Sequence, residues 1–387
     1  CSGWMINHGF CYSCPKERLI RPMRDVVIIG GGIAGISLAA RLAPFASVTV
    51  LEREPSLGYH STSRSAAMYI PNYGTALLRQ LILQSGDDLT GDHIVAGGVT
   101  SLRGELAIVG ADDEDILAKY MTGSTGLTQL SPDEAHDLCP ILRKDRFVSA
   151  IYDEQAADID VDKLFQGFIR MARQSGAQLL TGHEVLSLSQ TGNTWHITTD
   201  KDVLTADIVV NAAGAWAGVL ASMAGASPIS ITPCRRSAAI IPLADGLDPT
   251  PWPMIADIAE TWYAKPDAGR LMVSPADQDP IAPCDAWVDD MVLAMGIDRF
   301  EQATTVSVTR VEHQWACLRS FADDHEPVAG FDPVVHGFFW LAGQGGNGIQ
   351  TAPALSQLAA DIILSKTASS DASDANLING LSPARFN

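Results

Sequence analysis

The chain has 387 residues, of which 47% are hydrophobic, and carries a formal net charge of -19. That length suits two domains, or an interleaved pair, with an ample core. The acidic balance excludes nucleic acid and anionic membrane surfaces as favoured partners, and no apolar run approaches the ~20 residues that cross a bilayer.

The seven cysteines are an odd number scattered along the chain, which is typical of a reducing, cytoplasmic compartment. Cys11 and Cys14 form a C-x-x-C, but no second pair or histidine cluster completes a metal site, so we expect no metal. Residues 1–24 lack periodicity, and we interpret them as an extension outside the fold.

The predicted fold is organised around residues 25–52, where a β-branched strand, a glycine motif, a helix and a second strand follow in order. In the G-x-G-x-x-G motif, Gly30 permits a tight turn, Gly32 leaves room for a pyrophosphate, and Gly35 allows close helix packing. Glu52 ends the second strand, where its carboxylate can accept hydrogen bonds from a ribose. We therefore expect a dinucleotide site rather than a glycine-rich turn without a ligand.

The remaining elements are predicted from periodicity and turn residues. The polar segment 53–74 is expected to follow the bound cofactor outward. Helices are predicted at 74–83, 112–120, 131–138 and 161–175, and strands at 101–109 and 206–216. Between the last helix and the last strand, a meander of short strands is predicted at 178–180, 184–189, 194–199 and 203–205. Residues 229–309 have the texture of a separate antiparallel sheet. Short strands at 328–331 and 338–342 precede a helix at 352–364, and the tail after Ser365 is predicted to be mobile.

A second glycine-rich turn at residues 342–350 distinguishes FAD from NAD. This turn leads into a helix more than 300 residues after the first motif. Two helix N-termini would therefore point towards one long ligand. A flavin needs this arrangement, because its reduced ring carries negative charge that a helix dipole stabilises. The alternative is a turn that only caps a structural helix.

We therefore predict an α/β fold with a Rossmann-like FAD-binding domain, of the glutathione-reductase type, interleaved with an α+β substrate domain on a mixed or antiparallel sheet. The FAD-binding domain is assigned residues 25–70, 150–225 and 325–365, and the substrate domain residues 71–149 and 226–324. Residues 366–387 are assigned to the mobile tail.

Four motifs within residues 25–365 resemble those of the D-amino-acid oxidase superfamily of flavoproteins. They are E-R-E-x-x-x-G-Y-H-S-T-x-R-S-A-A, V-V-N-A-A-G-A-W, W-Y-A-K-P-D-A-G and G-G-x-G-I-Q-T. The bacterial D-arginine dehydrogenases are the most similar group within it. The resemblance implies an FAD-dependent dehydrogenase that transfers hydride from a D-amino acid to flavin N5, giving an imino acid and then a 2-oxo acid and ammonia.

The resemblance also implies which residues line the FAD, in addition to the three motif glycines. They are Ala34, Glu52, Arg53, Ser61, Thr62, Ser63, Arg64, Ser65, Ala66, Ala67, Met68, Val185, Gly345, Gly346, Asn347, Gly348, Ile349 and Gln350. Cys317 matches a position at which related sarcosine oxidases form a thioether to the flavin. We favour non-covalent FAD, with Cys317 as a small buried residue.

By the same resemblance, Arg319 is the expected partner of the substrate carboxylate, since a guanidinium binds a carboxylate bidentately. Tyr73 and Tyr263 are expected to add phenolic hydrogen bonds. Three further substrate residues are expected at matching positions: Arg236, Gly346 and Gln350.

Glu105 matches the family position that meets the cationic end of D-arginine or D-lysine. A surface acid at a strand edge is the alternative. The chain departs from the family at Met68 and Ile70, which replace His and Thr, and at Asn347, which replaces Tyr. The expected substrates are thus D-amino acids with basic or large apolar side chains.

Two other functions remain open. One is an oxygen-using oxidase of D-amino acids, glycine or secondary amines. The other is a flavin-binding subunit without chemistry of its own, which the loss of the family histidine at Met68 allows. The sequence does not indicate the electron acceptor or the oligomeric state.

Overall fold

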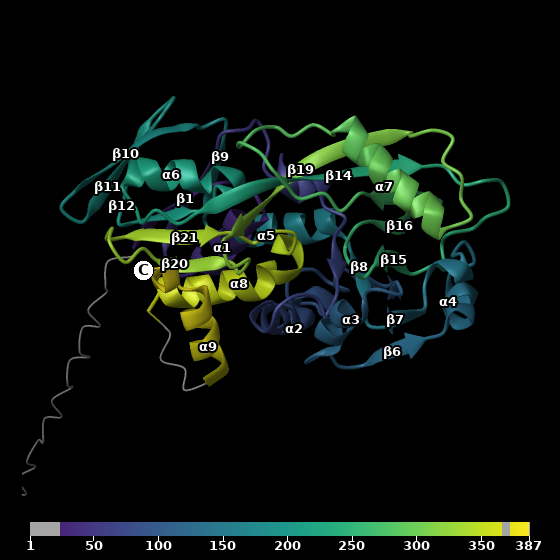
Figure 1. Ribbon diagram of the computed structural model, residues 1–387. Coiled ribbons are helices and arrows are strands. Elements are labelled where there is room, and N and C mark those ends of the chain that lie inside the picture. Colours follow the sequence, from purple (N-terminus) through teal and green to yellow (C-terminus); the bar gives the residue numbers. More distant parts are fainter. Residues whose placement is uncertain (1–23, 366–371, 387) are drawn as a thin grey trace, which may run out of the picture.

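The computed structural model describes residues 24–365 and 372–386, which form two large sheets and two small three-stranded sheets, with helices packed around them (Figure 1). The predicted extension, apart from Arg24, lies outside these ranges, as do Cys11 and Cys14. Figure 1 shows the sheet that contains β1 on the left and the sheet that contains β15 and β16 on the right.

The first sheet has six strands in the order β20-β21-β13-β1-β2-β9. They are β1 (Asp25–Ile29), β2 (Ser47–Glu52), β9 (Gln178–Thr181), β13 (Ile208–Asn211), β20 (Val328–Phe331) and β21 (Phe338–Ala342). Neighbours pair in parallel except β20, which runs antiparallel to β21. A parallel sheet of this kind places the ends of β1 and β2 at one edge, where ligands of such folds bind.

The turn between β1 and helix α1 (Ile33–Leu42) requires two of the predicted glycines. Gly30 has a φ of +116°, and a Cβ on it would stand 2.2 Å from the Ala212 oxygen. A Cβ on Gly35 would stand 2.0 Å from the Gly30 oxygen. Since no other residue fits these two positions, α1 can begin directly above the end of β1.

The two faces of the first sheet have separate hydrophobic cores. Val26 and Ile28 pack towards α1, α5 (Val161–Gln174) and α8 (Gly348–Ile363). Val27 packs towards α6 (Ala217–Ala224) and a three-stranded sheet. The strands of that sheet are β10 (Val185–Thr191), β11 (Thr194–Thr199) and β12 (Val203–Ala206). Successive residues of β1 thus pack on opposite faces of the sheet, as expected of a strand that is buried on both faces.

The second sheet has nine strands, in the order β18-β14-β17-β16-β15-β5-β7-β6 with β19 also paired to β14. The strands are β5 (Glu105–Val109), β6 (Leu127–Leu130), β7 (Ser149–Asp153), β14 (Ile231–Ile241), β15 (Met254–Asp257), β16 (Tyr263–Asp267), β17 (Arg270–Ser274), β18 (Asp279–Pro280) and β19 (His313–Ala322). Only β5 and β15 pair in parallel among them, so the second sheet is mixed. Together with the parallel first sheet and its helices, this confirms the predicted α/β fold. The helices assigned to this part are α3 (Glu114–Met121), α4 (Pro132–Leu138) and α7 (Asp290–Ala303).

Several element boundaries differ from the prediction. The helix expected at 74–83 is α2 (Ala76–Thr90). It packs against α8, which covers one face of the first sheet. The strand expected at 101–109 is interrupted at Gly104, which has a φ of +77°. It forms β5 and the short β4 (Thr100–Leu102), which joins β3 (Met68–Tyr69) and β8 (Ala157–Ile159) in a small sheet.

The predicted mobile tail is wrong for residues 372–386. They form helix α9 (Ala372–Leu381) and a final 3-10 turn (Pro383–Phe386). Leu377 and Leu381 are completely buried in the same cluster as Ile363 of α8. The polar composition of the segment hid these two leucines, which lie four residues apart and so on one helix face.

Candidate active site

A long cleft runs from the end of β1 and β2 to the face of the second sheet formed by β14, β16, β17 and β19. Predicted cofactor residues that line it are Gly30, Gly32, Ala34, Glu52, Arg53, Ser61, Thr62, Arg64, Ser65, Ala66, Val185, Gly345, Gly346, Gly348 and Ile349. Predicted substrate residues that line it are Arg236, Tyr263 and Arg319, together with Gly346. The others do not: Gly35, Ser63, Ala67, Met68, Tyr73, Glu105, Asn347 and Gln350.

At the dinucleotide end, the Glu52 carboxylate is fixed against the glycine turn. Its Oε2 accepts a hydrogen bond from the Gly31 N–H at 2.7 Å, and Oε1 accepts one from the Glu54 N–H at 2.9 Å. A Cβ on Gly32 would meet only Thr62 Oγ1, at 3.3 Å. The space in front of the α1 N-terminus is therefore open, as the phosphates of a dinucleotide require.

The 3-10 turn η1 (Ser61–Arg64) joins the two sides of the cleft. Ser61 Oγ donates to the Leu318 oxygen at 2.6 Å, and Arg64 Nη1 donates to the Ala316 oxygen at 3.0 Å. Both acceptors belong to β19, the strand that carries Arg319. These two side chains thus hold the substrate-side strand against the cofactor side.

The second predicted helix N-terminus begins earlier than expected, at Gly348 rather than Ala352. Its first N–H groups have no partner within the helix, and Gly348 and Ile349 line the cleft. Gln350 instead braces the wall, because its Oε1 accepts a hydrogen bond from the Ile70 N–H at 3.0 Å while its Nε2 donates to Asn347 Oδ1.

At the substrate end, Arg236 and Arg319 lie on the paired strands β14 and β19. Cys234 faces Arg319 and Arg236 faces Cys317 in the register, so the two arginines are diagonal neighbours. Burial lowers the pKa of Arg236, and the nearby charge of Arg319 lowers it further. Burial opposes the charge of Arg319, but its neighbours, with Tyr263 foremost, raise its pKa overall.

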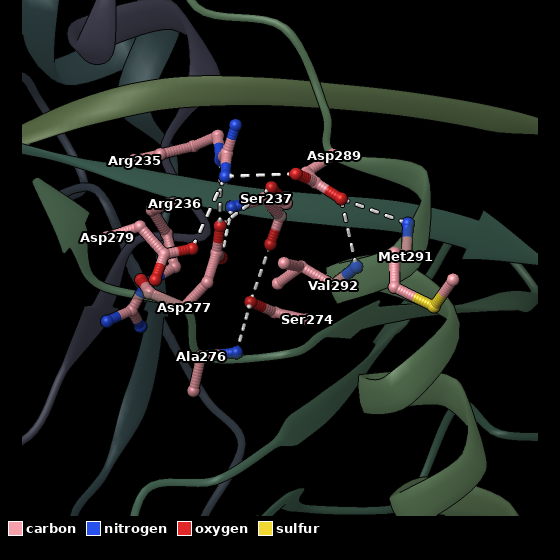
Figure 2. Close-up of polar contacts among 10 residues, drawn as sticks. All are labelled: Arg235, Arg236, Ser237, Ser274, Ala276, Asp277, Asp279, Asp289, Met291 and Val292. Atoms are coloured by element: carbon pink, nitrogen blue, oxygen red, sulfur yellow. Dashed lines mark hydrogen bonds and ion pairs between the residues drawn. The ribbon is translucent and has the colours of Figure 1, made fainter. Parts of the chain in front are cut away.

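Figure 2 shows that Arg235 and Arg236 leave β14 in different directions. Arg235 reaches Asp279 and Asp289, at 3.3 and 3.5 Å. Arg236 donates from Nε to the Asp277 carbonyl at 2.7 Å. Within the described ranges no carboxylate pairs with Arg236 or Arg319. Both guanidinium groups are thus available to an anionic ligand in the cleft.

Tyr73 and Glu105 are not among the residues that line the cleft. Burial raises the pKa of Tyr73, and the carboxylate of Glu260 beside it adds to the effect. Glu105 is only 6% exposed, so it is no surface acid. Tyr120 donates to its Oε2 at 3.2 Å. Burial and the facing Asp153 raise the pKa of Glu105 to about 7.

The sequence did not indicate the apolar residues that complete the cleft. They include Trp216, Ala238, Met272 and Trp315. Trp216 lies inside a quoted motif, but only the tertiary structure shows that its ring faces the cleft, with the Arg53 guanidinium carbon 4.1 Å from the ring centroid. Met272 and Ala238 look like ordinary core residues of strands, since alternation alone cannot identify which face is covered.

The glycine turn, the strand-end glutamate and the second helix N-terminus, all on one cleft, define a dinucleotide-binding protein. The model of the family described as DAO, FAD dependent oxidoreductase, matches residues 25–362, and the chain belongs to this family. FAD is the family's cofactor, and the donors and open glycine at the cleft suit it. The family predicted from the motifs is thereby confirmed.

Relatives match over nearly the whole chain. An uncharacterized oxidoreductase, YurR of Bacillus subtilis, is 26% identical, covering 91% of this chain and 98% of its own length. Glycine oxidase of Bacillus subtilis is 24% identical, covering 90% and 95%. The crystal structure of glycine oxidase from Geobacillus kaustophilus superposes with a TM-score of 0.79 at 22% identity, covering 93% and 98%. Of these three, the two with a named activity are glycine oxidases, so the predicted similarity to D-arginine dehydrogenases in particular is not supported.

None of the helices in residues 24–365 and 372–386 is long and apolar enough to cross a membrane. In the same ranges, no three His, Cys, Asp or Glu side chains gather as metal ligands would.

Proposed function

We propose that the protein binds FAD non-covalently in the cleft and oxidises the C–N bond of an amino acid whose carboxylate pairs with Arg319. Bound FAD would supply the hydride acceptor. The observation that carries the proposal is the position of Arg319, which lines the cleft next to the glycine turn that precedes α8. A guanidinium held there without an acidic partner suits a carboxylate ligand.

The chain's own residues would bind and orient the substrate. Arg319 and Arg236 attract the carboxylate, and the Tyr263 phenol beside them can donate a hydrogen bond. Ala238, Met272 and Trp315 form an apolar wall that excludes water and accepts an apolar side chain. We propose a D-amino acid with a large apolar or basic side chain as substrate. Binding of the basic class would depend on the carboxyl group of Glu105.

A second candidate is an oxygen-using oxidase of glycine or of a secondary amine. It is supported by the similarity of the chain to glycine oxidases. The family match fits either reaction. The two candidates differ in the substrate and in the final acceptor of electrons, and not in the anchoring of the carboxylate.

One experiment separates them. The yellow holoprotein is mixed without oxygen with D- and L-amino acids, glycine and N-methylglycine, and the flavin absorption is followed. We expect bleaching by a carboxylate-bearing amine in the wild type but not in Arg319→Ala. Peroxide formed after oxygen is readmitted identifies an oxidase. Unchanged absorption with every amine would contradict the proposed reaction and favour a non-catalytic flavoprotein.

A further inference from the structure

We propose that Asp277 is a positioning residue that fixes Arg236 for carboxylate binding. The inference rests on the proposed function, because it assumes that the Arg236 guanidinium meets the substrate. It concerns the loop at 275–278, between β17 and β18, which the sequence motifs do not single out.

Asp277 fills a gap in the ladder beside β14. Strand β17 pairs with β14 at residues 239–241, and β18 pairs with it at residues 234 and 235. Residues 236–238, including Arg236, thus lack a strand partner on that side. Backbone groups buried in such a gap need other hydrogen bonds.

The side chain of Asp277 supplies them at Ser237. Its Oδ1 accepts a hydrogen bond from the Ser237 N–H at 2.6 Å, and Oδ2 accepts one from Ser237 Oγ at 2.9 Å (Figure 2). Oδ2 also lies 3.6 Å from Arg235 Nε. The Asp277 side chain is only 1% exposed, so these charge-assisted contacts are strong. They fix the residues on both sides of Arg236.

The main chain of Asp277 then holds Arg236 itself. Its carbonyl accepts from Arg236 Nε at 2.7 Å, which leaves the two terminal nitrogens of the guanidinium for the cleft. The preceding Ala276 has a φ of +51°, an unfavourable conformation for alanine. The Ala276 N–H donates to Ser274 Oγ, which in turn donates to the Ser237 oxygen. Asp277 therefore holds Ser237 through its side chain and Arg236 through its carbonyl, so the position of Ser237 and the orientation of Arg236 are coupled.

A double-mutant cycle tests this coupling. The variants are Asp277→Asn, Arg236→Met and the double variant, with Asp279→Asn as matched control because Asp279 is an exposed acid that contacts Arg235 but not Ser237. The readouts are the Kd of acetate and propionate, from the perturbed visible spectrum of the holoprotein, and KM and kcat for the best substrate. FAD content and Tm are recorded for each variant.

We expect Asp277→Asn to raise Kd and KM about tenfold, the cost of disturbing hydrogen bonds to a charged group, with kcat nearly unchanged. The effect should disappear in the Arg236→Met background, because both changes remove the same interaction. A penalty that persists in that background overturns the inference, as does an Asp277→Asn variant that binds like the wild type.

A second variant keeps the test decisive if Asp277→Asn does not fold. Ser237→Ala removes only the hydroxyl held by Oδ2, so a smaller rise in KM, again dependent on Arg236, is expected; no rise, or a rise independent of Arg236, overturns the inference. Failure of the proposed function is recognised separately. In that case Arg319→Ala leaves acetate and propionate binding unchanged, whatever the cycle shows.

Discussion

The guanidinium of Arg319 packs against the backbone of Gly346. A Cβ on Gly346 would stand 2.6 Å from Arg319 Nη1 and 2.9 Å from its Cζ. The glycine lies two residues before the first residue of α8, whose N-terminus faces the cleft, whereas the arginine comes from β19 of the other large sheet. The contact therefore sets the position of the proposed carboxylate anchor relative to the proposed cofactor site.

Gly346→Ala should consequently displace Arg319 without unfolding the protein. A misplacement of about 1 Å at such a site can cost about 100-fold in kcat/KM, and we expect a loss of that order for the best amine of the panel. Gly218→Ala is the control, since a Cβ there would meet nothing within 4 Å. Full activity of Gly346→Ala would show that Arg319 is not the anchor or that it moves without consequence.

Arg319→Ala should lower kcat/KM for every amino acid alike. The expected loss is about 3–5 kcal/mol, as for one partner of a desolvated charge pair. FAD content should stay unchanged. Arg310→Ala, which alters an exposed arginine paired with Glu312, is the control. A loss confined to one class of side chain would assign Arg319 to side-chain recognition instead.

The sequence predicted the parts of this site that depend on local geometry. Gly30, Gly35 and Glu52 have roles that follow from a turn, a close approach and a strand end, each of which is encoded within 28 consecutive residues. Their neighbours on the chain are also their neighbours in space. The β1–α1–β2 unit was therefore recognisable without the structure.

The parts that depend on distant contacts were not predictable in the same way. Gln350 was expected at the ligand, yet it bonds to Ile70, 280 residues away. Asp277 fills a gap between strands, and no local pattern marks such a gap. Leu377 and Leu381 are buried because α8 offers them an apolar surface. Each of these positions is set by packing between elements, which composition and periodicity do not contain.

The raised pKa of Glu105 predicts a pH-dependent stability. Its pKa rises from 4.5 to about 7 because of burial and the facing Asp153. Between these values the folded state holds a proton that the unfolded state releases, so this contribution to stability is present below about 4.5 and is lost as the pH rises to 7. Glu105→Gln keeps an acceptor for Tyr120 but does not ionise.

Compared by urea unfolding, Glu105→Gln and the wild type should therefore be similar at pH 4.5. At pH 8 the variant should be more stable, by a difference on the order of 3 kcal/mol. Glu134→Gln, at an exposed helix cap, serves as the control. A constant difference between the two proteins across this pH range would contradict the burial of an ionisable Glu105.

Side-chain selection gives a separate test of Glu105. Glu105→Leu should weaken turnover of D-arginine and D-lysine while sparing D-methionine and D-leucine, because only a cationic side chain would be left without its charged partner. The measurement is kcat/KM across these four substrates. Equal losses across the four would instead assign Glu105 a structural role, through its hydrogen bond with Tyr120 and its pairing opposite Asp153.

Cys317 provides a test of the proposed non-covalent attachment of the flavin. It lines the cleft on the same strand as Arg319, two residues away. A thioether to flavin requires the thiolate, which is the nucleophilic form of cysteine. Burial raises the pKa of the Cys317 thiol, and this effect outweighs the opposing charges of Arg319 and Arg236. We therefore expect Cys317 to act as a space-filling thiol rather than as a nucleophile, as buried cysteines usually do. Acid precipitation of the holoprotein should leave the yellow colour in the supernatant, and Cys317→Ala should retain its full FAD content. Yellow colour that stays with the precipitated wild type, but not with Cys317→Ala, would establish a covalent bond at this residue instead.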